Sequence, residues 1–270
     1  MYIISAVLEK GQSKVALYDK EYKLIKKKDG SAADLSKLCL EVISDGGITP
    51  ADVQYIGIAV DNNDAVAADL EKEIGVKCFK ESFMNARALG EAYMSKDAPY
   101  LLILKIDDTI DCGIVIDKKA FSGSQQLGGK IAHMAINFGG YECTCGRKGC
   151  FEAYSNNSGL KRIAAEAGVE NAESITHKKL FAMNTPSAEL AKKLYVKYLA
   201  CGITNVINLF QPNELILEGP FTEVGDELMK PMMDIVLQEQ YSRSMPNKCN
   251  IRSANSDADT ALIGAAMLGR

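Results

Sequence analysis

The residues best suited to chemistry are one histidine and three cysteines near the middle of the chain. His133 is followed by Cys143, Cys145 and Cys150, which gives the spacing H-x9-C-x-C-x4-C. Three thiolates and one imidazole form the closed tetrahedral Cys3His site that proteins use for structural zinc. Glycines nearby supply the positive φ angles that a tight metal-binding turn requires; they are Gly139, Gly140, Gly146 and Gly149. The sequence therefore predicts a structural zinc, with no open coordination position for catalysis.

The alternative is that these thiols are free and buried, with His133 as an ordinary loop residue. Three cysteines between residues 143 and 150, set among glycines, argue against that alternative. The other five cysteines fall singly on predicted strands or helices, where core positions are more common than metal binding; they are Cys39, Cys78, Cys112, Cys201 and Cys249. The second histidine, His177, lies in a polar segment before two lysines, so we expect it on the surface.

The composition is that of a globular chain long enough to bury a large core. Of the 270 residues, 47% are hydrophobic and 24% are charged, and the net charge is −4. This balance argues against a nucleic-acid-binding surface, which usually shows an excess of basic residues. No apolar run approaches the ~18 residues of a membrane span, and Met1–Lys10 lacks the basic start of a signal peptide. We expect a cytoplasmic protein, in which eight cysteines indicate thiols or metal rather than disulfides.

The predicted elements occur twice in the same order, three strands followed by helix, strand and helix. In the first half, strands are expected at 3–8, 14–18, 22–25, 53–60 and 76–79, and helices at 33–44, 64–73 and 86–94. In the second half, strands are expected at 100–106, 113–116, 119–121, 215–217 and 249–253, and helices at 187–209, 224–238 and 259–267. Lys26, Lys27 and Lys28 indicate a solvated edge strand. Two copies of βββαβα predict an α/β fold of two mixed-sheet lobes related by duplication.

A glycine- and cysteine-rich insertion at 123–154 resembles the signature of the ROK family, named for repressors, open reading frames and kinases. Residues 129–134 read G-K-I-A-H-M and residues 143–154 read C-T-C-G-R-K-G-C-F-E-A-Y. They are similar to the family's G-E-x-G-H-M and C-x-C-G-x-x-G-C-x-E-A-Y. Three weaker matches to the family lie elsewhere in the chain and occur in the family's order, at Phe79–Tyr93, Leu215–Pro220 and Asp257–Ala266.

The resemblance implies an actin-like, hexokinase-like (ribonuclease H-like) two-lobed fold that transfers the γ-phosphoryl group of Mg-ATP to a sugar. Residues 1–117, completed by a C-terminal helix at about 257–270, are expected to form the first lobe. Residues 118–256 are expected to form the second lobe, with the zinc-binding insertion at 123–154.

The position that the resemblance assigns to the catalytic base holds Phe83. The family's N-D-A-N corresponds to residues 82–85, which read S-F-M-N. A phenyl ring accepts no proton from a sugar hydroxyl, and loss of a general base typically costs about 10²–10⁴ in rate. The family's sugar-binding asparagine and glutamate are replaced by Ser82 and Lys130, and a lysine donates hydrogen bonds but accepts none. No catalytic residue of the family is therefore in place.

The phosphate-binding loops have also diverged. The family's D-x-G-G-T corresponds to residues 7–11, V-L-E-K-G, and its G-T-G-x-G-G-G corresponds to residues 107–113, D-D-T-I-D-C-G. Three aspartates in the second segment repel a triphosphate unless a metal intervenes. The adenosine-side G-G-G reads Glu218-Gly219-Pro220, and the loop after strand 53–60 is shortened to Asp61-Asn62-Asn63. The sequence thus gives little support for Mg-ATP as a cofactor.

Two residues of the expected sugar site survive. The resemblance implies that His133, oriented by zinc through one ring nitrogen, faces the sugar with the other. It also implies that Glu152 takes a sugar hydroxyl. Glu152 has an alternative role at the start of a helix, where the helix dipole favours a carboxylate.

The sequence favours a zinc-containing ROK-family homologue that lacks efficient sugar phosphorylation and acts by binding a sugar-like ligand or by assembly. The alternative is an active hexose or N-acetylhexosamine kinase in which Asp61 or Glu81 replaces the base and Asp107, Asp108 and Asp111 hold Mg²⁺. A DNA-binding repressor is not expected, because the first strand begins where those proteins carry a helix-turn-helix module. Family members commonly assemble, so a homodimer or higher homo-oligomer is expected.

Overall fold

The chain forms two compact units. The computed structural model describes residues 1–270 except 62, 64, 96–97, 126, 245–247 and 255–258. The first unit comprises Met1–Leu101, Gly113–Gly128 and Asn255–Arg270, and the second comprises Leu102–Cys112 and Gly129–Ala254. The predicted lobes divided the chain at residue 117, so segments 102–112 and 118–128 each belong to the unit other than the one expected.

Some predicted features lie outside the described residues. They are Asn62 in the shortened loop, Asp64 at the start of a helix, and residues 257–258 of the terminal helix.

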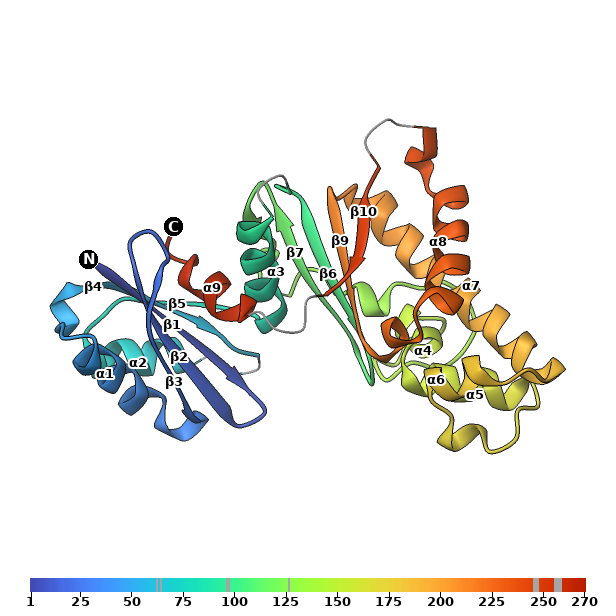
Figure 1. Ribbon diagram of the computed structural model, residues 1–270, viewed down its shortest axis with the longest axis horizontal. Helices are drawn as coiled ribbons and strands as arrows, with labels where there is room; N and C mark the ends of the chain where they lie inside the picture. The colour runs from blue at the N-terminus through green and yellow to red at the C-terminus, as the bar shows by residue number, and fades with distance from the viewer. Residues whose placement is uncertain (62, 64, 96–97, 126, 245–247, 255–258) are drawn as a thin grey trace. The chain divides into compact units, whose positions relative to one another are not determined.

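The first unit is built on a mixed five-stranded sheet with the order β3-β2-β1-β4-β5 (Figure 1). β1 pairs antiparallel with β2 and parallel with β4. β3 lies at the edge, as its lysines predict. The strands are β1 (Tyr2–Glu9), β2 (Gln12–Asp19), β3 (Leu24–Ser31), β4 (Val53–Ala59) and β5 (Cys78–Glu81), and the helices are α1 (Leu35–Asp45), α2 (Val66–Ile74), α3 (Phe83–Met94) and α9 (Thr260–Ala266).

The second sheet repeats the first. Its order is β10-β9-β6-β7-β8, which is the same arrangement when the strands of each half are numbered from one to five. The strands are β6 (Leu101–Ile106), β7 (Ile110–Ile116), β8 (Lys119–Ala120), β9 (Glu214–Glu218) and β10 (Asn250–Ser253). The helices are α4 (Phe151–Ser155), α5 (Asn157–Glu166), α6 (His177–Ala182), α7 (Pro186–Phe210) and α8 (Asp226–Glu239). The shared order confirms the duplicated α/β fold.

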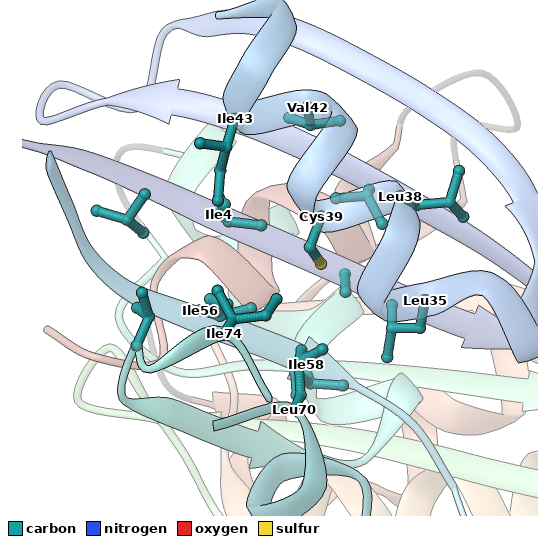
Figure 2. Packing of buried hydrophobic residues seen from close by; sticks show 14 of the residues in the cluster. Ile4, Leu35, Leu38, Cys39, Val42, Ile43, Ile56, Ile58, Leu70 and Ile74 are labelled. Atoms are coloured by element: carbon teal, nitrogen blue, oxygen red, sulfur yellow. The ribbon is translucent and has the colours of Figure 1, made fainter. Parts of the chain in front are cut away.

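Both faces of the first sheet are buried, so its central strands carry apolar side chains in continuous runs. Ile4 of β1 and Ile56 and Ile58 of β4 point to the face that α1 and α2 cover (Figure 2). Leu35, Leu38, Val42 and Ile43 of α1 and Leu70 and Ile74 of α2 fill that side. Residues of the opposite pleat, including Ile3, Val7 and Tyr55, pack with α9 instead.

Helices α3 and α9 cross at very short range. A Cβ atom on Gly264 of α9 would lie 1.6 Å from the carbonyl oxygen of Ala86 in α3. Only glycine fits there, because a Cβ cannot approach backbone so closely. This contact holds the first turn of α3, which carries the expected catalytic position, against the core of the first unit.

Helix boundaries differ from prediction where polar caps were overlooked. α3 begins at Phe83 rather than residue 86, because the Ser82 side chain accepts a hydrogen bond from the backbone N–H of Asn85 at 3.3 Å. α5 was not predicted, although the Asn156 side chain caps it by accepting from Gly159 N–H at 2.7 Å. Neither was α6, which Thr176 caps. Ser, Thr and Asn at such positions are the sequence signal that was available.

The surface position expected for His177 is wrong. Its side chain is only 2% exposed, and its Nε2 lies 2.8 Å from the hydroxyl oxygen of Tyr195. The Tyr195 hydroxyl donates to the carbonyl oxygen of Ser155 at 2.8 Å, so it accepts from the Nε2–H of His177. Burial lowers the pKa of His177 from its ordinary value of 6.5 to about 4. The flanking lysines led to the wrong prediction, because they indicate an exposed segment although His177 lies in the core of the second unit.

This burial predicts a specific loss of stability in mild acid. Below pH 6.5 the unfolded chain takes up a proton that the folded chain accepts only near pH 4, so stability falls as the pH drops through this window. Between pH 7 and pH 5 His177 should lower the free energy of unfolding by about 2 kcal/mol. His177→Gln, which can still donate to Tyr195, should remove this part of the slope in urea titrations. Parallel pH profiles for variant and wild type would contradict the assignment.

Candidate functional site

The four predicted metal ligands come together. One ligand atom from each of His133, Cys143, Cys145 and Cys150 lies within 4.8 Å of all the others. Cys143 Sγ is 3.6 Å from His133 Nδ1, and Cys145 Sγ is 3.7 Å from Cys150 Sγ. Three sulfurs and one imidazole nitrogen thus surround a common centre, and the cluster could hold a metal ion.

Backbone hydrogen bonds shape the turn that carries two of these cysteines. Cys143 N–H donates to Arg147 O at 2.8 Å, and Gly146 N–H donates to Cys143 O at 2.9 Å. The Arg147 guanidinium donates to the backbone carbonyl of His133 at 3.2 Å, which links the turn to the histidine. The fourth ligand, Cys150, is the residue immediately before α4.

A tyrosine on α4 anchors the loop between the ligands. The Tyr154 hydroxyl oxygen accepts from the Asn137 side chain at 2.8 Å and from Tyr141 N–H at 2.9 Å. The Tyr141 ring stacks on Tyr154 with centroids 4.4 Å apart. The Arg162 guanidinium lies over the Tyr141 ring, 4.5 Å from its centroid, and the Tyr141 hydroxyl donates to the carboxylate of Glu166. The loop is therefore tied to α4 and α5.

The thiols of the cluster differ in their environment. A backbone N–H from Arg147 lowers the pKa of Cys145, whose side chain is exposed. Burial raises the pKa of Cys150 to about 12. Metals bind thiolates, so an incoming ion has to displace the proton from Cys150.

Glu152 faces both the cysteine turn and the β6–β7 connection. The residue is 7% exposed and lies in the first turn of α4. Its Oε2 accepts from the backbone N–H of Ile110 at 2.9 Å, and its Oε1 accepts from the Thr144 hydroxyl at 3.4 Å. Both carboxylate oxygens are engaged within the chain.

The segment aligned with the second phosphate loop is a tight acidic turn, Asp107–Asp111. Two of its backbone donors are bonded internally: Asp107 N–H to Thr109 O at 3.0 Å, and Thr109 N–H to the Asp107 carboxylate at 3.2 Å. Asp108 accepts from Asn156 and Asn157 side chains, each at 2.9 Å. Loops that bind phosphate instead aim free N–H groups at the anion.

Phe83 occupies the first position of α3 and offers no proton acceptor. Its backbone N–H donates to the carboxylate of Asp61 at 3.2 Å. Glu81 accepts from Ser82 N–H at 2.8 Å and from the Asn85 side chain at 3.2 Å, and it also bonds to Ser122. Of the two carboxylates considered as replacement bases, Glu81 is thus held in a polar network and Asp61 is exposed at the end of β4.

The remaining expected contacts are also altered. The first phosphate loop is a two-residue β-hairpin turn, in which Lys10 and Gly11 have φ of 50° and 79° and Glu9 pairs with Gln12. Such a turn needs two residues at positive φ and leaves no excursion for a phosphate. Pro220, after β9, has no N–H to donate, and Lys130 is exposed.

A model of the ROK family matches residues 17–270. The chain belongs to the ROK family. It is 27% identical to a glucokinase from Halalkalibacterium halodurans over 219 residues, which are 74% of this chain and 65% of the glucokinase. It is also 27% identical to the xylose repressor of Bacillus subtilis over 179 residues, 65% of this chain and 46% of the repressor. The aligned segments therefore span less than two thirds of each relative.

The crystal structure of a ROK hexokinase from Thermus thermophilus has the same fold as this ROK chain. The two align with a TM-score of 0.79 at 22% identity, covering 99% of this chain and 98% of that chain. This similarity confirms the actin-like, hexokinase-like fold that the resemblance implied. Within the described residues, no helix is both long and apolar enough to cross a membrane.

The sequence did not indicate two polar groups that shape the site. Asn156 and Asn157 tie the acidic turn to α5, and Asn85 accepts from Ile114 N–H at 2.9 Å while donating to Glu81. An Asn-Asn pair just after the cysteine motif was the only available signal for the first. The other cysteines outside the cluster are half-buried except Cys39, which is fully buried.

The cluster predicts that metal content depends on Cys145 although its side chain is exposed. Cys145→Ser should reduce bound metal by at least about tenfold, because the ion loses a thiolate ligand. The melting temperature should fall with it. Cys201→Ser, a half-buried cysteine of α7 outside the cluster, is the matched control and should retain the metal. Equal metal content in the two purified variants, measured by mass spectrometry, would rule the cluster out.

Proposed function

We propose that this ROK-family chain is a sugar-kinase homologue with structural zinc that has lost efficient phosphoryl transfer. It acts by binding a sugar-like ligand or by assembling with other subunits. The observation that carries the proposal is the acidic turn Asp107–Asp111. In the segment that the resemblance aligns with the second phosphate loop of the kinases, this chain has three carboxylates, and the backbone N–H groups of Asp107, Thr109 and Ile110 are already bonded.

The negative charges of this turn repel the phosphate groups of a nucleotide. A triphosphate approaching it meets Asp107, Asp108 and Asp111, of which Asp107 alone has a nearby lysine, Lys105 at 3.4 Å, in the described ion pairs. Catalysis of phosphoryl transfer depends on donors and cations that stabilise the transferring group. The Ile110 N–H, at the end of this turn, donates to Glu152.

The lost base and the lost first loop support the same conclusion independently. Phe83 offers neither an acceptor nor a hydrogen bond to a sugar hydroxyl, and its ring packs beside the apolar residues under α9. The Lys10–Gly11 turn lies on a different strand pair and has also lost its phosphate-binding form. A single change can be compensated, but these lie on three separate elements.

Zinc suits the donor set better than other metals. With Zn–S of about 2.3 Å and Zn–N of about 2.0 Å, a regular tetrahedron has S–S edges of about 3.8 Å and S–N edges of about 3.6 Å. Two of the six observed separations match these lengths, 3.7 Å between Cys145 and Cys150 and 3.6 Å between Cys143 and His133 Nδ1, and all six are within 4.8 Å. All four positions are then filled by protein, so the ion contributes stability rather than a reactive water.

His133 is the surviving candidate for sugar binding. Because Nδ1 faces the cluster, the Nε2–H group is available to a ligand hydroxyl, and zinc fixes the ring that carries it. Glu152 contributes less, since both its oxygens already have partners.

An active kinase with a relocated base is the second candidate. Its supporting observation is the Asp61 carboxylate, which reaches the backbone N–H of Phe83 and so lies beside the position of the lost base. Glu81 is less suited, because its oxygens bond to Ser82, Asn85 and Ser122.

A turnover assay separates the two. Zinc-loaded protein with Mg-ATP should release no ADP that depends on glucose, xylose or N-acetylmannosamine, while the Halalkalibacterium halodurans glucokinase serves as positive control. Phe83→Asp should remain inactive, because restoring a base recovers at most about 10²–10⁴ in rate and leaves the phosphate loops unchanged. Sugar-dependent turnover that disappears in Asp61→Asn but persists in Glu81→Gln would establish the second candidate and reject the first.

A further inference from the structure

Glu152 connects the metal cluster to the acidic turn by direct contacts. Toward the cluster, its Oε1 lies 3.4 Å from the Thr144 hydroxyl and 4.0 Å from Cys143 Sγ. Toward the turn, its Oε2 accepts from Ile110 N–H, the first residue of β7, at 2.9 Å. The carboxylate is 7% exposed, so solvent competes little for either bond.

Three more hydrogen bonds join the same two regions. Asn157 N–H donates to Asp107 O at 2.7 Å, and the Asn156 and Asn157 side chains donate to Asp108. All of the donors lie at the junction of α4 and α5, a few residues after Glu152. Besides its own internal hydrogen bonds, the acidic turn is therefore held by one short stretch of helix.

The start of that stretch is set by two metal ligands. Cys150 is the residue before α4, and it bridges to Ala135 in the segment that follows His133. Phe151 N–H, at the first position of α4, donates to Met134 O at 2.8 Å. An ion that draws His133 and Cys150 together thus fixes where α4 begins, and with it the direction of the Glu152 side chain.

We infer that Glu152 is a positioning residue through which metal occupancy of the cluster holds the acidic turn Asp107–Asp111 in place. The inference rests on the metal centre proposed above. In metal-bound protein, the Ile110 amide is protected by a charged acceptor. When the ion leaves, the cysteine turn and the first turn of α4 lose their common anchor, and the acidic turn is released from the helix junction.

Amide hydrogen exchange at Ile110 tests this link directly. In the full-length zinc-bound protein, Glu152→Ala should accelerate exchange at Ile110 by about 10- to 100-fold, the range expected for loss of a hydrogen bond to a charged group. Glu152→Gln, whose amide oxygen can still accept from Ile110, should retain most of the protection. Glu142→Ala removes an exposed carboxylate from the same loop and should leave the rate unchanged.

Removal of zinc from wild-type protein with a chelator should accelerate exchange at Ile110 to a similar degree. Ile216 of β9, fully buried in the same unit, reports whether the unit stays folded. If Ile216 stays protected while Ile110 keeps its zinc-bound exchange rate after zinc removal, metal occupancy does not hold the turn and the coupling is overturned.

The possible failures are distinguishable. Wild-type protein that binds no zinc overturns the proposed metal centre. Zinc-bound protein whose Ile110 amide is unaffected by Glu152→Ala, or affected equally by Glu142→Ala, overturns the coupling alone.

Discussion

The close grouping of four potential metal ligands is the constraint on which the middle of this chain depends. Between β8 and α4 the described residues form one short 3-10 helix at Ile131–His133 and two isolated bridges, Ala135–Cys150 and Glu142–Lys148. Such a segment, rich in glycine, buries little apolar surface and orders few residues by backbone pairing, so its conformational entropy is poorly offset. Four ligands within 4.8 Å of one another supply the missing constraint. The ligands determine where α4 begins. The position of α4 in turn determines where Glu152 and the acidic turn lie.

The fold is that of the ROK hexokinase, and the proposed function supposes that only the groups in the segments aligned with the phosphate loops have changed. Gly264 still allows α9 to cross α3 at backbone contact, so the first turn of α3 stays in position although it presents Phe83. The β6–β7 connection carries carboxylates that bond to its own backbone and to α5. In the proposed function these bonds take the place of contacts to an anion. Donors buried without an anion would lack partners, which is costly, and here the turn itself and Glu152 accept from them.

Features set by short stretches of sequence were predictable, and features set by contacts between distant residues were not. The four predicted zinc ligands lie within one segment, so their spacing alone indicated the cluster. The repeat of apolar residues and the order of the elements indicated the duplicated sheets. The hydrogen bond between Glu152 and Ile110 joins residues 42 positions apart, and neither residue type predicts it. His177 shows the same limit: its neighbours in sequence are lysines, but its Nε2–H donates a hydrogen bond inside the core to the hydroxyl oxygen of Tyr195 of α7, 18 positions away. α5 and α6 were missed for a local reason, since their caps at Asn156 and Thr176 were visible in the sequence.

Nucleotide binding tests the central claim most directly, namely that the scaffold and metal centre persist while the phosphate site is lost. Zinc-loaded protein should be titrated with Mg-ATP by isothermal calorimetry, with and without a saturating sugar. The account predicts no saturable binding up to about 1 mM nucleotide, the upper end of ordinary substrate affinities. Saturable one-to-one binding at micromolar Mg-ATP would contradict it, because the acidic turn would then have to hold a triphosphate.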